Sequence, residues 1–255
     1  MKKIFLSIII IALLFSSCTT LSEVEVEDTQ GVKRLIKIEM NEGNSISTLN
    51  FIYEGDFLKE IEMQGANASI KFKYDQEKII ERESPDDIYQ YEYNGDKVLK
   101  ETYFSDGELY GEDEYIYGLN NELQTVKNTS YVFLNGVKTP YIDYKDYEYD
   151  ASNNSVKATN RDNNQDYITT IYDDRINPYT SVNYFSPLLW ITGNAYNNNV
   201  LEMKQYYNGD LLRSDSYSYE FDNDGFITKE TLTETYFNSN STDTNTIISN
   251  YFYNK

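Results

Sequence analysis

The sequence predicts an all-β fold, an antiparallel meander of hairpin repeats that forms a twisted, curved sheet of roughly fourteen to sixteen strands. Three observations support this prediction. A short phrase recurs in which two aromatic residues, two positions apart, precede Asp or Asn and a turn. In the first half of the chain it returns about every twenty residues, the length of one two-stranded unit. The chain also holds 26 Tyr and 12 Phe but only 4 Pro, which suits strands with one wet face.

The recurring phrase is the end of a strand followed by a hairpin turn. Aromatic residues two positions apart point to the same face of a strand. Asn-Gly and Asp-Gly supply the positive φ angles that tight turns require, as in Tyr91-Glu92-Tyr93-Asn94-Gly95. The phrase occurs at 51–57, 72–75, 91–98, 147–150, 206–211, 219–227 and 251–254.

The elements follow one another along residues 33–255, which we expect to form a single domain. Residues 33–117 form the most regular block of hairpins. Residues 122–172 contain a long hairpin around Asn135-Gly136, and residues 200–254 return to the pattern. We expect one packed face of the sheet and one face lined by tyrosine or by charge. The sequence leaves open whether the sheet closes partly into an open barrel or folds into a sandwich.

The pattern breaks between residues 173 and 199, which include the chain's one tryptophan, Trp190. We predict a short helix or irregular plug near 180–192 that closes one end of the sheet. The alternative is a loop that shapes a binding pocket. The candidate ligand-binding residues for that alternative are Tyr184, Phe185, Trp190 and Tyr196.

Residues 1–17 have the features of a signal peptide. Lys2 and Lys3 give a positive start, and the apolar run 4–15 that follows is too short for a stable transmembrane helix. Cys18 comes next and is the chain's one cysteine, so it forms no intramolecular disulfide. An ordinary secretory signal with an incidental cysteine is the alternative interpretation.

The segment Leu14-Phe15-Ser16-Ser17-Cys18 resembles the lipobox of bacterial lipoproteins, although Phe15 stands where Leu is usual. The resemblance implies cleavage before Cys18, acylation of Cys18 by palmitate-type chains, and attachment to a membrane through that lipid. Residues 18–32 then form an acidic tether. Thr19 replaces the Asp that retains lipoproteins in the inner membrane, so the resemblance implies the outer membrane, on its periplasmic face or at the cell surface.

Composition argues against several classes of function. The net charge is −20, or −22 once Lys2 and Lys3 leave with residues 1–17, and it repels nucleic acid. The chain has no histidine and no phosphate-binding loop, so we expect no enzyme, cofactor or metal. The run 222–225 is a candidate calcium loop, but a hairpin turn explains it better because no closing Glu follows.

The phrase resembles the YD repeat of Rhs and teneurin-type proteins. Together with the lipobox, Asn177-Pro178-Tyr179 and the unit 219–229, it is similar to uncharacterised Bacteroidota lipoproteins with YD-like hairpins. The spacing is irregular and the chain is too short for an Rhs shell, so no toxin-enclosing role is implied. The closer family brings no activity with it.

These features predict a non-catalytic envelope lipoprotein that binds a glycan or a protein. Tyr89, Tyr91 and Tyr93 share a strand face on which sugar rings could stack, although same-face aromatics also simply pack together. The alternative function is a structural or assembly accessory that contacts other envelope proteins through exposed sheet edges. A hydrolase that uses paired carboxylates is a distant alternative. The sequence does not decide the oligomeric state.

Overall fold

A computed structural model describes residues 33–43, 45–64, 68–119, 122–134, 137–152, 154–176, 198–238 and 241–254. These residues form sixteen strands and no helix. Among them no helix is long and apolar enough to cross a membrane. The strands are β1 Leu35–Glu42, β2 Ser45–Glu54, β3 Phe57–Gln64, β4 Ala68–Asp75, β5 Lys78–Glu83, β6 Asp87–Asn94, β7 Lys97–Ser105, β8 Glu108–Tyr117, β9 Leu123–Leu134, β10 Val137–Tyr149, β11 Ser155–Asn160, β12 Tyr167–Ile176, β13 Asn198–Tyr207, β14 Asp210–Phe221, β15 Ile227–Asn238 and β16 Ser241–Tyr253.

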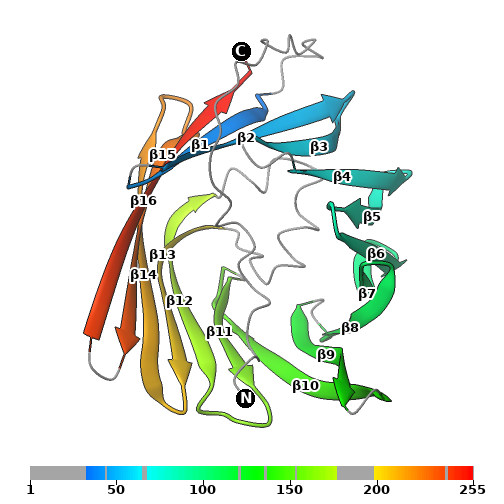
Figure 1. The fold of residues 1–255 in the computed structure, drawn as a ribbon. Coiled ribbons are helices and arrows are strands. Elements are labelled where there is room, and N and C mark those ends of the chain that lie inside the picture. Colours follow the sequence, from blue (N-terminus) through cyan, green and yellow to red (C-terminus); the bar gives the residue numbers. More distant parts are fainter. Residues whose placement is uncertain are drawn as a thin grey trace.

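The strands form one closed antiparallel barrel, in which each strand pairs with its neighbours in the sequence (Figure 1). The barrel closes where β1 pairs with β16, for example at Ile38 and Tyr251. The predicted meander of hairpins is therefore confirmed, whereas the expected open barrel or sandwich is wrong. Closure has a physical reason, because an open sheet would leave the polar backbone edges of β1 and β16 without partners.

The hairpin turns follow the predicted chemistry. Gly55 and Gly95 take positive φ angles of 60° and 58° in the turns after β2 and β6. A β-bulge lies beside each of these turns, where the register shifts at Tyr53 and at Tyr93. The hairpin predicted around 135–136 is confirmed by the pairing of Leu134 with Val137.

Most aromatic pairs of the phrase belong to the buried face of the sheet, whereas Tyr206 of the unit 206–211 lies on the outer face. Side chains that point into a closed barrel converge whereas outward ones diverge, so the buried face is the inner one. Its core includes Leu58, Ile79 and Ile227, each 1% exposed. The remaining buried apolar residues are Leu35, Ile38, Leu49, Phe51, Ile61, Phe72, Tyr91, Val98, Tyr115, Leu123 and Tyr251.

A ring of tyrosine hydrogen bonds runs around one end of the barrel. Each tyrosine hydroxyl donates to a backbone carbonyl on the preceding strand, so hairpins that share a turn at this end are joined to their neighbours by a side-chain hydrogen bond as well as by the backbone ladder. This explains why the phrase repeats. The described pairs are Tyr53 to Leu35 (2.9 Å), Tyr74 to Leu58 (2.7 Å), Tyr93 to Ile79 (2.7 Å), Tyr117 to Val98 (2.9 Å), Tyr149 to Leu123 (2.8 Å), Tyr172 to Ser155 (2.6 Å), Tyr219 to Val200 (2.8 Å) and Tyr253 to Ile227 (2.9 Å).

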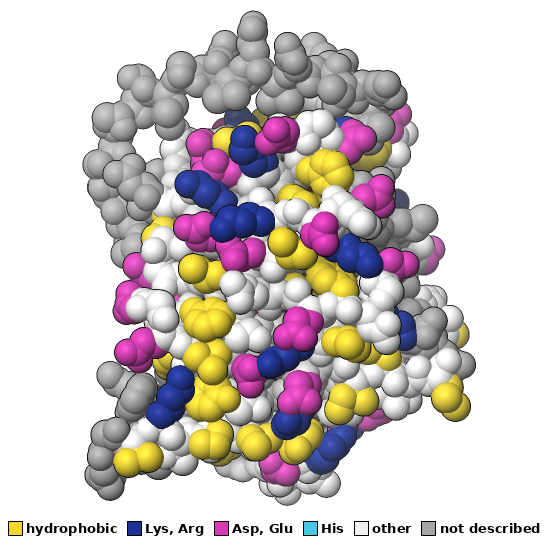
Figure 2. Space-filling model, turned by 90° about the vertical axis from the view of Figure 1, so that its right-hand side faces the viewer, with side chains coloured by type: hydrophobic (Ala, Val, Ile, Leu, Met, Phe, Trp, Pro, Cys, Tyr) yellow, Lys and Arg dark blue, Asp and Glu magenta, His cyan; other side chains and the backbone are white. Residues whose placement is uncertain are grey.

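The outer face of the barrel carries paired charges around its circumference, with exposed apolar side chains such as Ile80, Leu99 and Ile116 between them. Lysine and glutamate side chains pair on strands all round the barrel, and Figure 2 shows acidic and basic side chains interspersed with hydrophobic ones over the wall around β4 to β8. The expectation of a tyrosine-lined or charged second face is met mainly by charge, because most of the repeat tyrosines lie inside and Tyr206 is an exception. The pairs are Lys37–Glu39, Lys73–Glu81, Lys100–Glu112, Lys127–Glu114, Lys157–Glu148, Lys204–Glu202 and Lys229–Glu220.

Candidate functional site

The two ends of the barrel differ in their connections. The end that holds Lys33 and Asn254, here called the termini end, also carries the tyrosine ring and the longest connection, 177–197. At the opposite end every connection is short, and the longest is 161–166. Side chains of the inner wall near the opposite end are partly exposed, which makes that wall the candidate site.

The residues that the sequence singled out fall elsewhere in the chain. Cys18 and the four candidate ligand-binding residues all lie outside the described residues. The helix or plug predicted near 180–192 also lies outside them. These predictions therefore stay predictions. The four candidates are Tyr184, Phe185, Trp190 and Tyr196.

An aromatic row crosses six neighbouring strands of the inner wall. Its members face one another in register from β5 to β10: Arg82, Tyr89, Tyr103, Gly111, Ser130 and Tyr141. The Arg82 guanidinium lies 3.8 Å from the Tyr89 ring centre, and the Tyr89 and Tyr103 rings stack with centres 5.6 Å apart. The row is accessible at its β10 end, where Tyr141 is 52% exposed.

Gly111 leaves room for the Tyr103 ring in this row. A Cβ atom at Gly111 would lie 2.4 Å from Tyr103 Cε1 and 3.1 Å from the Thr129 carbonyl oxygen. The Tyr103 ring therefore occupies the space that the side chain of any other amino acid at position 111 would fill. On its other side it contacts Tyr110, with ring centres 5.1 Å apart. The glycine at position 111 thus allows the aromatic contacts of Tyr89, Tyr103 and Tyr110 to continue from β6 to β8.

An acidic row lies two residues further along the same strands, toward the termini end. Its members are also in register, from β6 to β10: Tyr91, Glu101, Asp113, Asn128 and Asp143. Asn128 Nδ2 donates to Asp113 Oδ1 at 2.6 Å. Tyr91 is 5% exposed, and its hydroxyl has no hydrogen-bond partner among the described residues. A row of three carboxyls and an amide beside stacked rings offers many acceptors and few cations.

Burial changes the charge state of the acidic row. It raises the pKa of Glu101 to about 7, against the lowering effect of Arg82 and with a further rise from Asp113. Arg82 does not neutralise Glu101 closely, because Nη2 lies 3.9 Å from Oε1. The Tyr115 hydroxyl donates to Glu101 Oε2 at 2.9 Å. Near neutral pH the Glu101 carboxyl therefore exists in both protonation states, as donor and as acceptor.

Burial also shifts the pKa values of the neighbouring groups in the direction that disfavours their charged forms. Burial raises the pKa of Asp113 and of Asp143, and the Asn128 amide partly offsets the rise at Asp113. Burial also lowers the pKa of Lys145, which the charges of Asp143 and Asp113 oppose. Burial thus disfavours the charged form of each of these groups.

A second polar cluster lies on the inner face of β14 to β16. Arg213 Nε donates to Asp215 Oδ1 at 2.7 Å, and the same guanidinium pairs with Glu234. The Asn245 amide donates to Glu42 at 2.6 Å and to Glu234 at 3.3 Å. Asp215 is fully buried, and its Oδ2 atom has no hydrogen-bond partner within the described strands. Burial raises the pKa of Asp215, which Arg213 opposes. Apart from Asp215 Oδ2, the charged groups named here find their partners within the cluster, which is consistent with a role in packing.

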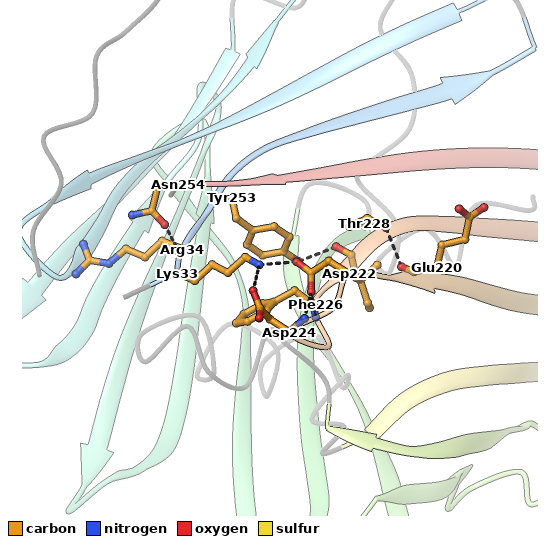
Figure 3. A network of polar contacts seen from close by, with 10 residues as sticks. Lys33, Arg34, Glu220, Asp222, Asp224, Phe226, Thr228, Tyr253 and Asn254 are labelled. Atoms are coloured by element: carbon orange, nitrogen blue, oxygen red, sulfur yellow. Dashed lines mark hydrogen bonds and ion pairs between the residues drawn. The ribbon is translucent and has the colours of Figure 1, made fainter. Parts of the chain in front are cut away.

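A hollow of about 590 Å³ at the termini end is lined by Lys33 and the β14–β15 turn. Figure 3 shows Lys33 between Asp222 and Asp224, with Tyr253 and Phe226 beside it. Asp222 Oδ1 also accepts from the backbone N–H groups of Asp224 and Phe226, each at 2.9 Å. The run 222–225 is thus a hairpin turn whose carboxylates bind a lysine. The described residues hold no group of acidic, Cys or His side chains that could bind a metal ion.

The rows were not singled out from the sequence, although part of the signal was present. Tyr89 and Tyr91 were placed on one strand face, and the turn after Tyr93 fixes which residues of the next strand lie opposite them. Counting back from that turn brings Glu101 beside Tyr91 only if the bulge at Tyr93 is included. Alternation alone shifts the partner by one residue and moves Glu101 to the outer face.

Comparison with known proteins gives a likeness of fold. No family model matches the chain, and no curated protein matches it. A porin-like protein from Bacteroides uniformis ATCC 8492 has a similar structure, with a TM-score of 0.54 and 13% identity over 86% of this chain and 96% of that one. A porin-like protein from Bacteroides vulgatus ATCC 8482 gives a TM-score of 0.41 and 15% identity, over 86% and 98% of the two chains. At such identities the first likeness concerns the fold alone.

Proposed function

We propose that this chain is a non-catalytic envelope lipoprotein whose barrel stands in water and binds a ligand on its inner wall. The observation that carries the proposal is the polarity of the two faces. Ion pairs such as Lys100–Glu112 and Lys204–Glu202 lie on the outside among exposed apolar side chains, while the apolar core is inside. The Bacteroides likeness adds the same architecture from a porin-like protein, which is compatible with an envelope role.

The outer face is unsuited to hydrocarbon. A membrane-spanning barrel presents an apolar band about 25 Å tall to the lipid, and a lysine at its midplane costs about 2–4 kcal/mol. Here lysines lie in the middle of β7 and β13, at Lys100 and Lys204. Thr231, Thr233 and Thr235 line the outer face of β15. Membrane attachment in this proposal therefore rests on the lipid at Cys18.

The alternative role, assembly through exposed sheet edges, has little support in the described barrel. All sixteen strands have partners on both sides along at least part of their length. The tip of β10 extends past β11, which pairs with β10 only from Lys145 onward. The Tyr144 carbonyl accepts from the Arg161 N–H, so the backbone groups of Tyr144 point toward β11. Pro140, four residues earlier, points the same way and lies on the free edge. Because Pro140 has no N–H to offer, it discourages pairing with an added strand.

The hydrolase alternative has one observation in its favour, which is Glu101 with a pKa of about 7 beside Asp113 in the register. A general acid must reach the substrate oxygen. The Glu101 carboxyl is instead 6% exposed and accepts the Tyr115 hydroxyl. These contacts favour a role in binding and packing. Release of new reducing ends from an oligosaccharide by the wild type, but not by Glu101→Gln, would reverse that preference.

The test of the proposal is the Cys18→Ser variant of the full chain. We expect it to leave the membrane fraction and to remain folded and monodisperse in buffer without detergent. Wild type treated in parallel should stay with the membranes. If the variant stays in the membrane fraction, or aggregates until detergent is added, the water-exposed barrel held by a lipid is wrong.

A further inference from the structure

We propose that the aromatic row and the acidic row together form a binding site for a linear, uncharged oligosaccharide. This deepens the proposed function by naming the ligand class, and it rests on that proposal only for access from water. The two rows are defined by strand register, so they are parallel and perpendicular to the strands. Residues two apart along a strand are about 6.7 Å from each other, which sets the separation of the rows.

The length of the rows suits an extended chain. The aromatic row crosses β5 to β10, five steps of about 4.8 Å, or about 24 Å in all. Short connections surround this end of the barrel, the nearest being 84–86, 106–107 and 135–136. A ligand that lies along the rows would therefore contact several strands at once, as a chain of sugar rings does.

The chemistry of the rows matches the two sides of a sugar ring. The Tyr103 ring and the half-exposed Tyr141 ring offer apolar surface against which the C–H face of a sugar can pack, whereas Arg82 covers one face of the Tyr89 ring and Tyr103 stacks on it. Asp113, Asn128 and Asp143 offer acceptors and an amide donor for the hydroxyl groups at the ring edge.

The buried Tyr91 hydroxyl is the second observation that points to a ligand. It lies in the acidic row opposite Glu101, it is almost completely buried, and the described residues give it no hydrogen-bond partner. A buried hydroxyl without a partner costs about 1–3 kcal/mol, so such groups usually mark a place for another polar atom. A sugar hydroxyl at this position would give the Tyr91 hydroxyl the hydrogen-bond partner that it lacks.

Charge selects against acidic polymers. The acidic row contributes three carboxyls against Arg82 and Lys145, and the whole chain carries −20. A polyuronate or a sulfated glycan would be repelled. Uncharged hydroxyl-rich chains are the class that the acceptors, the Asn128 amide and the aromatic side chains of the two rows fit.

The experiment is calorimetric titration of the full chain with linear hexasaccharides. The probes are maltohexaose, cellohexaose, xylohexaose and N-acetylchitohexaose, with hexagalacturonate as the acidic comparison. We expect at least one uncharged probe to bind and hexagalacturonate not to bind. Loss of a stacking ring, in Tyr103→Leu, should weaken that binding about tenfold or more. Asn128→Ala, which removes a hydrogen-bonding side chain and no ring, should weaken it about fivefold or more.

The matched control is Tyr206→Leu. Tyr206 stacks on Tyr167 with ring centres 4.4 Å apart, so it has the same chemistry as Tyr103, but it lies on the outer face. We expect its affinity to equal that of wild type, and circular dichroism should show all three variants folded. Failure of every uncharged probe to bind, tighter binding of hexagalacturonate, or equal losses in Tyr206→Leu and Tyr103→Leu would each overturn the inference. The Cys18→Ser solubility test stands apart from all these outcomes.

Discussion

The buried Glu101 carboxyl predicts how stability depends on pH. Its pKa is about 7 in the folded barrel, against an ordinary value of 4.5, chiefly because burial disfavours the charged form. The folded state therefore holds the proton more tightly than the unfolded chain. The stability this contributes is fully present below pH 4.5 and is lost as pH rises toward 7. At about 1.4 kcal/mol per pH unit, the interval corresponds to ~3 kcal/mol.

Glu101→Gln tests this arithmetic, since glutamine keeps the shape and the acceptor for the Tyr115 hydroxyl but cannot ionise. We expect urea unfolding, followed by far-ultraviolet circular dichroism, to show nearly equal free energies for variant and wild type near pH 4.5. By pH 8 the variant should be more stable by ~3 kcal/mol. The control is Glu114→Gln on the outer face, which loses a half-exposed pair with Lys127 and should change stability at pH 8 by less than about 1 kcal/mol. A Glu101→Gln difference that stays constant from pH 4.5 to 8 would refute the reasoning.

Two further predictions concern the scaffold. Tyr93→Phe removes the 2.7 Å hydrogen bond from the Tyr93 hydroxyl to the Ile79 carbonyl, and it should lower the free energy of unfolding by about 1–2 kcal/mol. A free energy of unfolding equal to that of wild type in urea titration would show that the tyrosine hydrogen bonds at this end do not stabilise the barrel. Gly111→Ala places a Cβ against the Tyr103 ring and should cost about 1–3 kcal/mol. In a Tyr103→Ala background that cost should fall by about half or more, as a double-mutant cycle measures. If Gly111→Ala destabilised the Tyr103→Ala background as much as wild type, the added Cβ would clash with a group other than the Tyr103 ring.

Much of the fold was predictable because the repeat phrase carries its own geometry. Aromatic residues two apart, followed by Asn-Gly or Asp-Gly, specify a strand face and a turn, as the hairpin around Gly95 shows. Closure was not predictable from these local signals. It depends on β1 and β16 meeting, and Ile38 and Tyr251 carry no mark of pairing beyond their alternation.

The candidate site was harder to predict than the fold. From the sequence alone Glu101 resembles any other charge on a solvent-exposed strand, because its inward orientation depends on the bulge two residues before it on β7, between Val98 and Lys100. In the sequence, Gly111 is a residue that weakens a strand. The structure explains it, because the Tyr103 ring occupies the space that a side chain at position 111 would need. Asp113 and Asn128 come together across β8 and β9, whose connection has no Asn-Gly or Asp-Gly signal to fix the register. The sequence instead directed attention to Trp190 and its neighbours, which lie outside the described residues.

The central claim is that water, and not lipid, surrounds the barrel. The most direct test places a nitroxide on the outer face at opposite sides of the ring, through Lys100→Cys on β7 and Thr233→Cys on β15, in the lipidated chain reconstituted into vesicles. Electron paramagnetic resonance then compares relaxation by a water-soluble nickel chelate with relaxation by oxygen. We predict that the nickel chelate reaches both positions freely. Preferential relaxation by oxygen at both positions would place the outer wall in hydrocarbon and contradict the account.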